Sequence, residues 1–399
     1  MRRRRFLLSA AAVPALLGMR KNLLAADYDL VVRGGRVIDP SQRLDRVADV
    51  AVRAGKIAAI QRDIPGLAAE SIDARGKVVV PGLIDIHVHA RDAELPPAEF
   101  LSTGVTTMVD GGSRGADNID DLIKIARAAP NRLRILLNIA RLGNSPGGRG
   151  EFLDGIDAAD VAKARAAAEK HREWVIGIKA RLSRPIAGDL DLEVLRRARQ
   201  VADPLRIPIM IHIGDTASPL PRILALLRRG DIVTHVYAMP HGIMDDRGRV
   251  LPEVREARKR GVVFDFGNGL NKHWTWDVAE SALKQEFPPD TISTDLNLPG
   301  RTDQVFDFPN VLSKFLLMGM PPDQVIARAT SNSAHAFQEL RSYGTLRPGA
   351  PADITLLDLR QGNFDFTDNE KGKRTGREKL FPYAVVMGGK RAPSVAEAR

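Results

Sequence analysis

The feature that most constrains this chain is a regular alternation of short apolar segments with helical stretches. The apolar segments are about as long as the buried strands of a parallel sheet. Eight of them occur within about 260 residues: Leu83–His87, Thr106–Asp110, Arg134–Ala140, Val175–Lys179, Pro208–His212, Ile232–Val236, Val262–Phe266 and Thr291–Asp295. The helical stretches between them include Ala159–Glu173, Leu192–Ala202, Pro219–Arg229 and Pro252–Lys259. Eight such units predict an α/β fold of the (β/α)8 TIM-barrel type over residues 82–343.

Both ends of the chain follow a different, strand-rich pattern. Residues 27–81 contain short apolar runs separated by turn residues: Tyr28–Val37, Asp49–Val52, Lys56–Ile60 and Lys77–Val80. A helix is predicted near Pro321–Phe337, and residues 344–399 then return to strands, with a basic loop at Lys371–Lys379 before a strand at Tyr383–Met387. The simplest arrangement joins both ends in one small β-sandwich domain.

Residues 1–26 are typical of an export signal. Four arginines, Arg2–Arg5, precede the apolar run Phe6–Gly18, and small residues follow at Ala25 and Ala26. The run is shorter than the ~20 residues that span a bilayer, and the segment Arg3–Leu7 resembles the twin-arginine signature. We therefore expect export of the folded protein by the twin-arginine machinery to the bacterial periplasm, with no stable membrane span. A disordered basic tail or a short membrane anchor is the alternative.

Much of the positive charge of the chain lies in this N-terminal segment. The formal net charge is +10, from 59 Lys and Arg against 49 Asp and Glu. Six of the basic residues and none of the acidic ones lie in residues 1–26, which leaves 53 against 49, or +4, for the rest. No basic groove with interleaved aromatic residues accompanies it, so we expect no nucleic-acid partner. The absence of cysteine excludes disulfides, thiolate ligands and a cysteine nucleophile.

The strongest functional signal lies at the carboxyl ends of the predicted strands. His87 and His89 alternate along the end of the first strand and so share one face. His212, His235 and Asp295 lie at the ends of the fifth, sixth and eighth strands. Four of the eight histidines in the chain thus gather at the end of the barrel where active sites form. Imidazole and carboxylate groups in such a cluster predict a divalent-metal site.

Lys179, at the end of the fourth predicted strand, needs a separate explanation. An ammonium group beside metal-binding histidines would repel the metal and would be costly to bury. A lysine carbamylated by carbon dioxide is instead an anionic oxygen ligand that can bridge two ions. The alternatives are an amine that reaches solvent and a Schiff-base lysine. Neither explains why the lysine lies at the same end of the predicted barrel as four histidines and an aspartate.

This set of side chains resembles, in order and in strand placement, the metal-ligand pattern of the amidohydrolase superfamily: His87, His89, Lys179, His212, His235 and Asp295. The resemblance implies two divalent metal ions, usually zinc. One ion would be held by His87, His89 and Asp295 and the other by His212 and His235, with carbamylated Lys179 between them. It also implies a bridging hydroxide as nucleophile and Asp295 as the catalytic residue that passes the proton to the leaving group.

Four short segments resemble one branch of that superfamily, the deacetylases often labelled dihydroorotase-like: Gly104–Thr107, Leu137–Arg141, Gly177–Arg181 and Ile211–Asp215. The resemblance implies hydrolysis of an amide or ester bond in a small acyl compound that bears a carboxylate. The alternatives are a cyclic amidase of dihydroorotase type and a catalytically silent barrel that only binds a ligand. The expected partner is a small-molecule substrate, and formation of a homo-oligomer is left open.

Five residues are candidates for binding the substrate. Arg181, Arg141 and Arg91 follow predicted strand ends, and a guanidinium group suits a carboxylate. The alternatives are an ion pair to an acidic residue for Arg181, a surface position for Arg141 and a solvent-facing position for Arg91. Asn268 stands in the loop after the seventh strand, where relatives often have a histidine, and His273 lies in the same loop.

Overall fold

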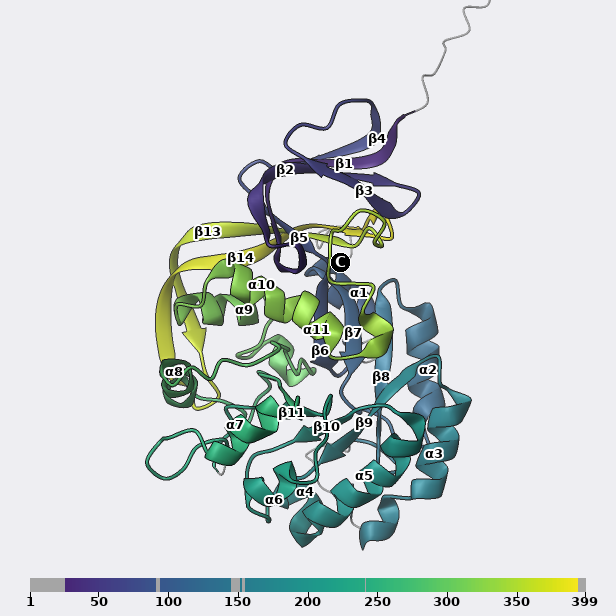
Figure 1. The fold of residues 1–399 in the computed structure, drawn as a ribbon, viewed down its shortest axis with the longest axis vertical. Helices are drawn as coiled ribbons and strands as arrows, with labels where there is room; N and C mark the ends of the chain where they lie inside the picture. The colour runs from purple at the N-terminus through teal and green to yellow at the C-terminus, as the bar shows by residue number, and fades with distance from the viewer. Residues whose placement is uncertain (1–25, 91–93, 145–150, 153–154, 241, 394–399) are drawn as a thin grey trace, which may run out of the picture.

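A parallel sheet of seven strands forms the barrel of this computed structural model, which describes residues 26–90, 94–144, 151–152, 155–240 and 242–393 (Figure 1). The strands lie side by side in chain order: β6 (Leu83–Val88), β7 (Val105–Asp110), β8 (Arg132–Asn138), β9 (Val175–Arg181), β10 (Ile209–His212), β11 (Ile232–Thr234) and β12 (Val263–Phe264). Each lies where the sequence predicted a strand. The predicted export signal lies almost wholly outside the described residues.

The barrel closes without a regular eighth strand. The segment predicted as that strand, Thr291–Asp295, lies between the two edges of the sheet. It makes an isolated parallel bridge to Asp265 beyond β12, and the next residue, Leu296, makes one to Val88 of β6. Asp295 has a left-handed backbone (φ 48°), which interrupts the ladder. The eighth strand is therefore an extended bridging segment.

Helices follow the strands and cover the outside of the barrel (Figure 1). They are α1 (Pro97–Ser102), α2 (Ile119–Ala128), α3 (Val161–Lys170), α4 (Arg184–Ala187), α5 (Asp191–Leu205), α6 (Leu220–Leu224), α7 (Pro252–Lys259), α8 (Trp276–Lys284), α9 (Phe308–Leu317), α10 (Pro322–Ala329) and α11 (Ser331–His335). The single helix predicted near Pro321–Phe337 is divided at Thr330 into α10 and α11. Among the described residues, no helix is long and apolar enough to cross a membrane.

Both ends of the chain form a second, mixed sheet, which is the expected small β-domain. Its order is β15-β14-β13-β5-β1-β2-β3, with β4 beside β1. The strands are β1 (Tyr28–Asp39), β2 (Leu44–Arg53), β3 (Lys56–Gln61), β4 (Ala68–Asp73), β5 (Val78–Pro81), β13 (Ile354–Thr367), β14 (Lys373–Met387) and β15 (Lys390–Arg391). Because β5 pairs with β1 on one side and with β13 on the other, it joins the two ends of the chain.

The prediction of a basic loop at Lys371–Lys379 is wrong for most of its length. From Lys373 onward this segment belongs to β14, paired antiparallel with β13. Its charged residues are mostly exposed, whereas Gly376 and Leu380 are buried, and this sparse apolar pattern resembles a loop in the sequence. The two long strands run from the small sheet along the barrel to α8 and α9 (Figure 1). The β-domain therefore reaches a loop of the barrel near the candidate site.

Candidate metal centre

A cavity of about 710 Å³ opens at the carboxyl ends of the barrel strands. Five of the six predicted metal ligands line it: His87, His89, Lys179, His212 and Asp295. The sixth, His235, is completely buried, with its ring centre 4.4 Å from that of His212. The structure therefore brings together all six side chains that the sequence singled out.

The end of β6 turns two histidines into this cavity. The register between β6 and β7 shifts between Asp85 and Val88. Within this irregular stretch Ile86 packs in an apolar cluster inside the barrel, whereas the next residue, His87, lines the cavity together with His89. A side chain at the neighbouring Gly111 would lie 2.2 Å from the His87 ring, so glycine is needed there.

Hydrogen bonds behind the cavity determine which nitrogen of His87 faces it. Nδ1 lies 3.0 Å from Oγ1 of Thr234, and that hydroxyl donates its own proton to Oδ2 of Asp265 at 2.7 Å. The hydroxyl must therefore accept from Nδ1–H, which leaves the lone pair of His87 on Nε2. Hydroxyl groups of Ser293 and Thr291 also donate to Asp265. Such partners orient metal-binding imidazoles in proteins.

His89 and His235 have the same kind of support. Nδ1 of His89 lies 2.8 Å from Oγ of Ser113, whose proton goes to Asp110 at 2.7 Å. Nδ1 of His235 lies 2.8 Å from the carbonyl oxygen of Gly267, to which it can only donate. Both histidines therefore also carry their lone pair on Nε2, the nitrogen on the side of Asp295.

Asp295 lies at the centre of these imidazoles. Its Oδ1 is 3.0 Å from Nε2 of His89 and 3.4 Å from Nε2 of His87. Its Oδ2 is 3.2 Å from Nδ1 of His273 and 3.9 Å from Nε2 of His235. Each carboxylate oxygen thus faces two imidazole rings, which is an arrangement that a divalent cation would stabilise.

The electrostatics of the site favour metal binding. Burial, with Lys179 and neighbouring imidazoles as further causes, holds the pKa of His87, His212 and His235 well below the usual range. These rings are therefore neutral near pH 7, which is the form that binds metal. Burial alone would raise the pKa of Asp295, but attraction to the protonated forms of the surrounding imidazoles holds it well below its usual value, so the carboxylate is already ionised when these rings are neutral. Neutral imidazoles, an ionised carboxylate and the unpartnered, buried Nε2 of His235 fit a divalent cation.

Lys179 is fully buried among these groups. Its Nζ lies 3.0 Å from Nε2 of His87 and 3.5 Å from Sδ of Met210. No ion pair to Lys179 is found among the described residues. Burial lowers its pKa to about 8, so a larger share of the amine is uncharged near neutral pH. A side chain at Gly112 would lie 2.6 Å from Lys179, so the lysine has little room to leave this position.

The three arginines predicted to bind substrate have different surroundings. Arg181 lines the cavity, but its Nη1 donates to Glu151 at 2.5 Å and to Asn144 at 2.6 Å. Arg141 forms an ion pair with Asp117 at 2.9 Å and is not among the residues that line the cavity. Arg91 lies outside the described residues. Arg181 therefore lines the cavity while it is paired with Glu151, whereas Arg141 is paired with Asp117 and does not line the cavity.

The two candidates after the seventh strand also differ. Asn268 is completely buried and does not line the cavity; its side chain accepts from Nζ of Lys314 at 2.7 Å and donates to the carbonyl oxygen of Gly269 at 2.9 Å. It supports the loop and is not placed to touch a substrate. His273 does line the cavity. Two contacts of the site had no signal in the sequence: that of His273 with Asp295 and that of Arg181 with the buried Glu151. In each pair the two residues come from distant segments of the chain.

Comparisons with known proteins agree with this arrangement. The amidohydrolase family matches over residues 78–392. The chain is 31% identical over 378 residues to a deacetylase of Enterococcus faecalis, which covers 91% of this chain and 98% of that protein. It is also similar to the crystal structure of an adenine deaminase, with a TM-score of 0.84, 30% identity and coverage of 92% and 99%. A dihydroorotase structure gives a TM-score of 0.82, 26% identity and coverage of 92% and 98%.

Proposed function

The chain belongs to the amidohydrolase family, and from this we propose that it is a metal-dependent hydrolase that cleaves an amide or ester bond. The substrate is a small acyl compound that bears a carboxylate. The observation that carries the proposal is the convergence of His87, His89 and His235 on Asp295, each with the lone pair of Nε2 directed to the centre. The deacetylase of similar sequence supports the reaction class.

The residues of the site would hold two divalent cations. His87, His89 and Asp295 suit one ion and His212 and His235 the other, with carbamylated Lys179 as the anion between them. Zinc is the metal we expect, because neutral imidazole and carboxylate are its usual ligands. When bound, the ions make a water molecule acidic enough to act as a nucleophile near neutral pH, and they polarise the carbonyl group of the substrate.

Asp295 moves the proton in this reaction. Its carboxylate is ionised, lines the cavity and is held between pairs of imidazoles, so it is placed to accept a proton from the attacking water. A new C–O bond then forms at the carbonyl carbon, and the bond to the leaving nitrogen or oxygen breaks. The proton passes from Asp295 to that leaving atom. The products are a carboxylic acid and an amine or alcohol.

Arg181 is the residue we expect to recognise the carboxylate of the substrate. Within the described residues its protein partners, Glu151 and Asn144, engage only Nη1. These bonds orient the guanidinium group at the cavity, and its other nitrogens keep their donors. The carboxylate of Glu151 partly neutralises the charge of Arg181. The affinity of Arg181 for the carboxylate of the substrate therefore depends on the geometry of its hydrogen bonds as much as on net charge.

A screen with zinc-loaded protein tests the proposal. N-acyl amino acids, O-acyl hydroxy acids, cyclic amides and adenine serve as substrates, and the metal content is measured on the same samples. We expect about two ions per chain and turnover of the first two substrate classes. Turnover of only the cyclic amides or only adenine would contradict the proposed activity and indicate a cyclic amidase or a deaminase instead. Absence of turnover of every substrate by the metal-loaded protein would indicate a binding protein.

Lys179→Ala tests the two-metal arrangement in the same assay. The carbamate cannot form, so we expect activity to fall by at least ~100-fold, as is typical when a metal site loses an oriented group. Lys170→Ala is the matched control, because this lysine lies on the surface beside Asp120. Full activity of Lys179→Ala, or fewer than about one ion per wild-type chain, would contradict the mechanism.

A further inference from the structure

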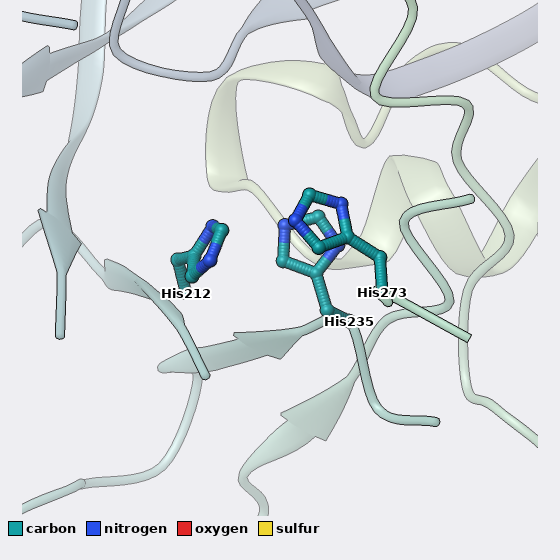
Figure 2. A group of neighbouring side chains, drawn as sticks. All are labelled: His212, His235 and His273. Carbon is teal, nitrogen blue, oxygen red and sulfur yellow. The ribbon is translucent and has the colours of Figure 1, made fainter. Parts of the chain in front are cut away.

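His273 lies beside His212 and His235, the two residues assigned above to the second metal ion. Figure 2 shows the rings of His212, His235 and His273 grouped together. The ring centre of His273 lies 3.7 Å from that of His235 and 5.0 Å from that of His212. One nitrogen of each ring lies within 4.8 Å of those of the other two. His212 and His235 lie at the ends of β10 and β11, and His273 comes from the loop between β12 and α8.

Two nitrogens in this group are buried without a hydrogen-bond partner among the described residues, Nδ1 of His273 and Nε2 of His235. Nδ1 of His273 lies 3.2 Å from Oδ2 of Asp295, but not in hydrogen-bond geometry. Buried polar atoms in native proteins almost always have a partner, so two unpartnered nitrogens at adjacent imidazoles indicate a missing one. A cation that accepts both lone pairs would satisfy them together.

The backbone of His273 is fixed from its C-terminal side. The amide of Trp274 donates to Oδ1 of Asn369 at 3.1 Å, and the amide of Asn369 donates back to the carbonyl oxygen of Trp274 at 3.4 Å. Trp274 and Trp276 are fully buried, with ring centres 4.7 Å apart. A residue directly before such an anchored segment is held in place, as a metal ligand requires.

We propose that His273 is a third imidazole ligand of the second metal ion, together with His212 and His235. The inference rests on the proposed function, which assigned only the last two to that ion. Three imidazoles with one open position form a ligand set known from catalytic zinc sites. The second ion then has three protein ligands without Lys179 and remains bound when the carbamate is absent.

Metal titration of purified protein tests this inference without an activity assay. The full chain and its His273→Asn variant are stripped of metal and titrated with zinc against a chromophoric chelator, and with cobalt, whose visible spectrum reports its ligands. We expect the variant to bind one of the two ions at least ~10-fold more weakly and to change the cobalt spectrum. His171→Asn is the control, because this histidine pairs with Asp120 away from the cavity.

Two further measurements keep the outcomes distinct. The Lys179→Ala variant is expected to keep the metal ion that His273→Asn loses. Metal titration of a second variant, His273→Gln, together with circular dichroism of both His273 variants, shows whether loss of the ion reflects misfolding. Wild-type affinities and an unchanged cobalt spectrum in a folded His273 variant would overturn the inference and leave the proposed function standing. Loss of an ion in that variant, with no hydrolysis by the wild type, would support the inference while the proposed function fails.

Discussion

At the scale of single residues, the orientation of the candidate metal ligands depends on hydroxyl groups behind them. Thr234 accepts from His87 and donates to Asp265, and Ser113 links His89 to Asp110 in the same way. Each hydroxyl is held by its hydrogen bond to a buried carboxylate, and its oxygen in turn fixes the orientation of an imidazole ring. The candidate ligands are therefore already oriented in the metal-free protein, an arrangement that favours tight binding of a metal ion.

Thr234→Val tests this role with little change in side-chain volume. Nδ1 of His87 loses its acceptor, so the ring is no longer held with its lone pair on Nε2. We expect the zinc affinity of the site to fall by about 10- to 100-fold, measured by chelator competition. Thr106→Val is the matched control, because this threonine is equally buried but contacts the carbonyl oxygen of Leu83 at the start of β6. Equal affinities of the two variants would contradict the prediction.

At the scale of elements, the loop between β12 and α8 is held by parts of the chain outside the barrel strands. Lys314 of α9 is fully buried and donates to Asn268 and to the carbonyl oxygen of Gln304, both at 2.7 Å. Asn369, from the turn between β13 and β14, donates to Gln304 and to the carbonyl oxygen of Gly269. The β-domain thus helps to place the loop that carries His273.

Burial lowers the pKa of Lys314 from its usual 10.5 to about 7, and this predicts a pH-dependent stability. Between these values the unfolded chain keeps the proton and the folded chain releases it. The free energy of unfolding therefore rises with pH through this window, by up to ~1.4 kcal/mol per pH unit, and this gain is lost as pH falls towards 7. Lys314→Met removes the titrating group.

Urea unfolding at pH 7, 8, 9 and 10 measures the effect. The stability of the wild type minus that of Lys314→Met should increase with pH, on top of a constant loss of about 1 to 3 kcal/mol from the unsatisfied acceptors. Lys284→Met, at an exposed position, controls for the substitution itself. A difference that stays constant from pH 7 to pH 10 would show that Lys314 is not the titrating group.

At the scale of the whole molecule, a buried ion pair links the sheet formed by the chain ends to the barrel. Arg132 of β8 lies 2.9 Å from Asp353, just before β13, and its guanidinium stacks on the ring of Tyr343 at 3.8 Å. The other oxygen of Asp353 accepts from the amide of Gly388. The pair is therefore part of the contact between the two sheets.

Asp353→Ala should lower the free energy of unfolding by about 3 kcal/mol, because it leaves a largely buried guanidinium without its partner. Asp45→Ala is the matched control, since it breaks an exposed pair with Arg36 and should cost at most ~1 kcal/mol. Urea denaturation of both variants at pH 7 measures the two losses. Similar losses would mean that Arg132 and Asp353 contribute no more than a surface pair.

The sequence alone determined the barrel, the two-ended β-domain and the six grouped side chains. These follow from local patterns, because apolar strands alternate with helices and the ends of parallel strands meet at one edge. The part of β14 before Tyr383 was not predicted as a strand, because its exposed charged residues outnumber its few buried apolar ones. The bridging segment at Thr291–Asp295 was predicted as a regular strand, because the left-handed backbone of Asp295 has no signal in the sequence.

Only the tertiary structure decided how the site is supported and which neighbours it has. The orientation of His87 depends on Thr234 and Asp265, and the surroundings of Arg181 depend on Glu151. The place of His273 depends on Asn369, almost a hundred residues away. Such contacts join segments that are distant in the chain, and their spacing in the sequence carries no periodic pattern. The sequence therefore determined which chemical groups meet, whereas packing between distant segments decided their orientation, protonation and partners.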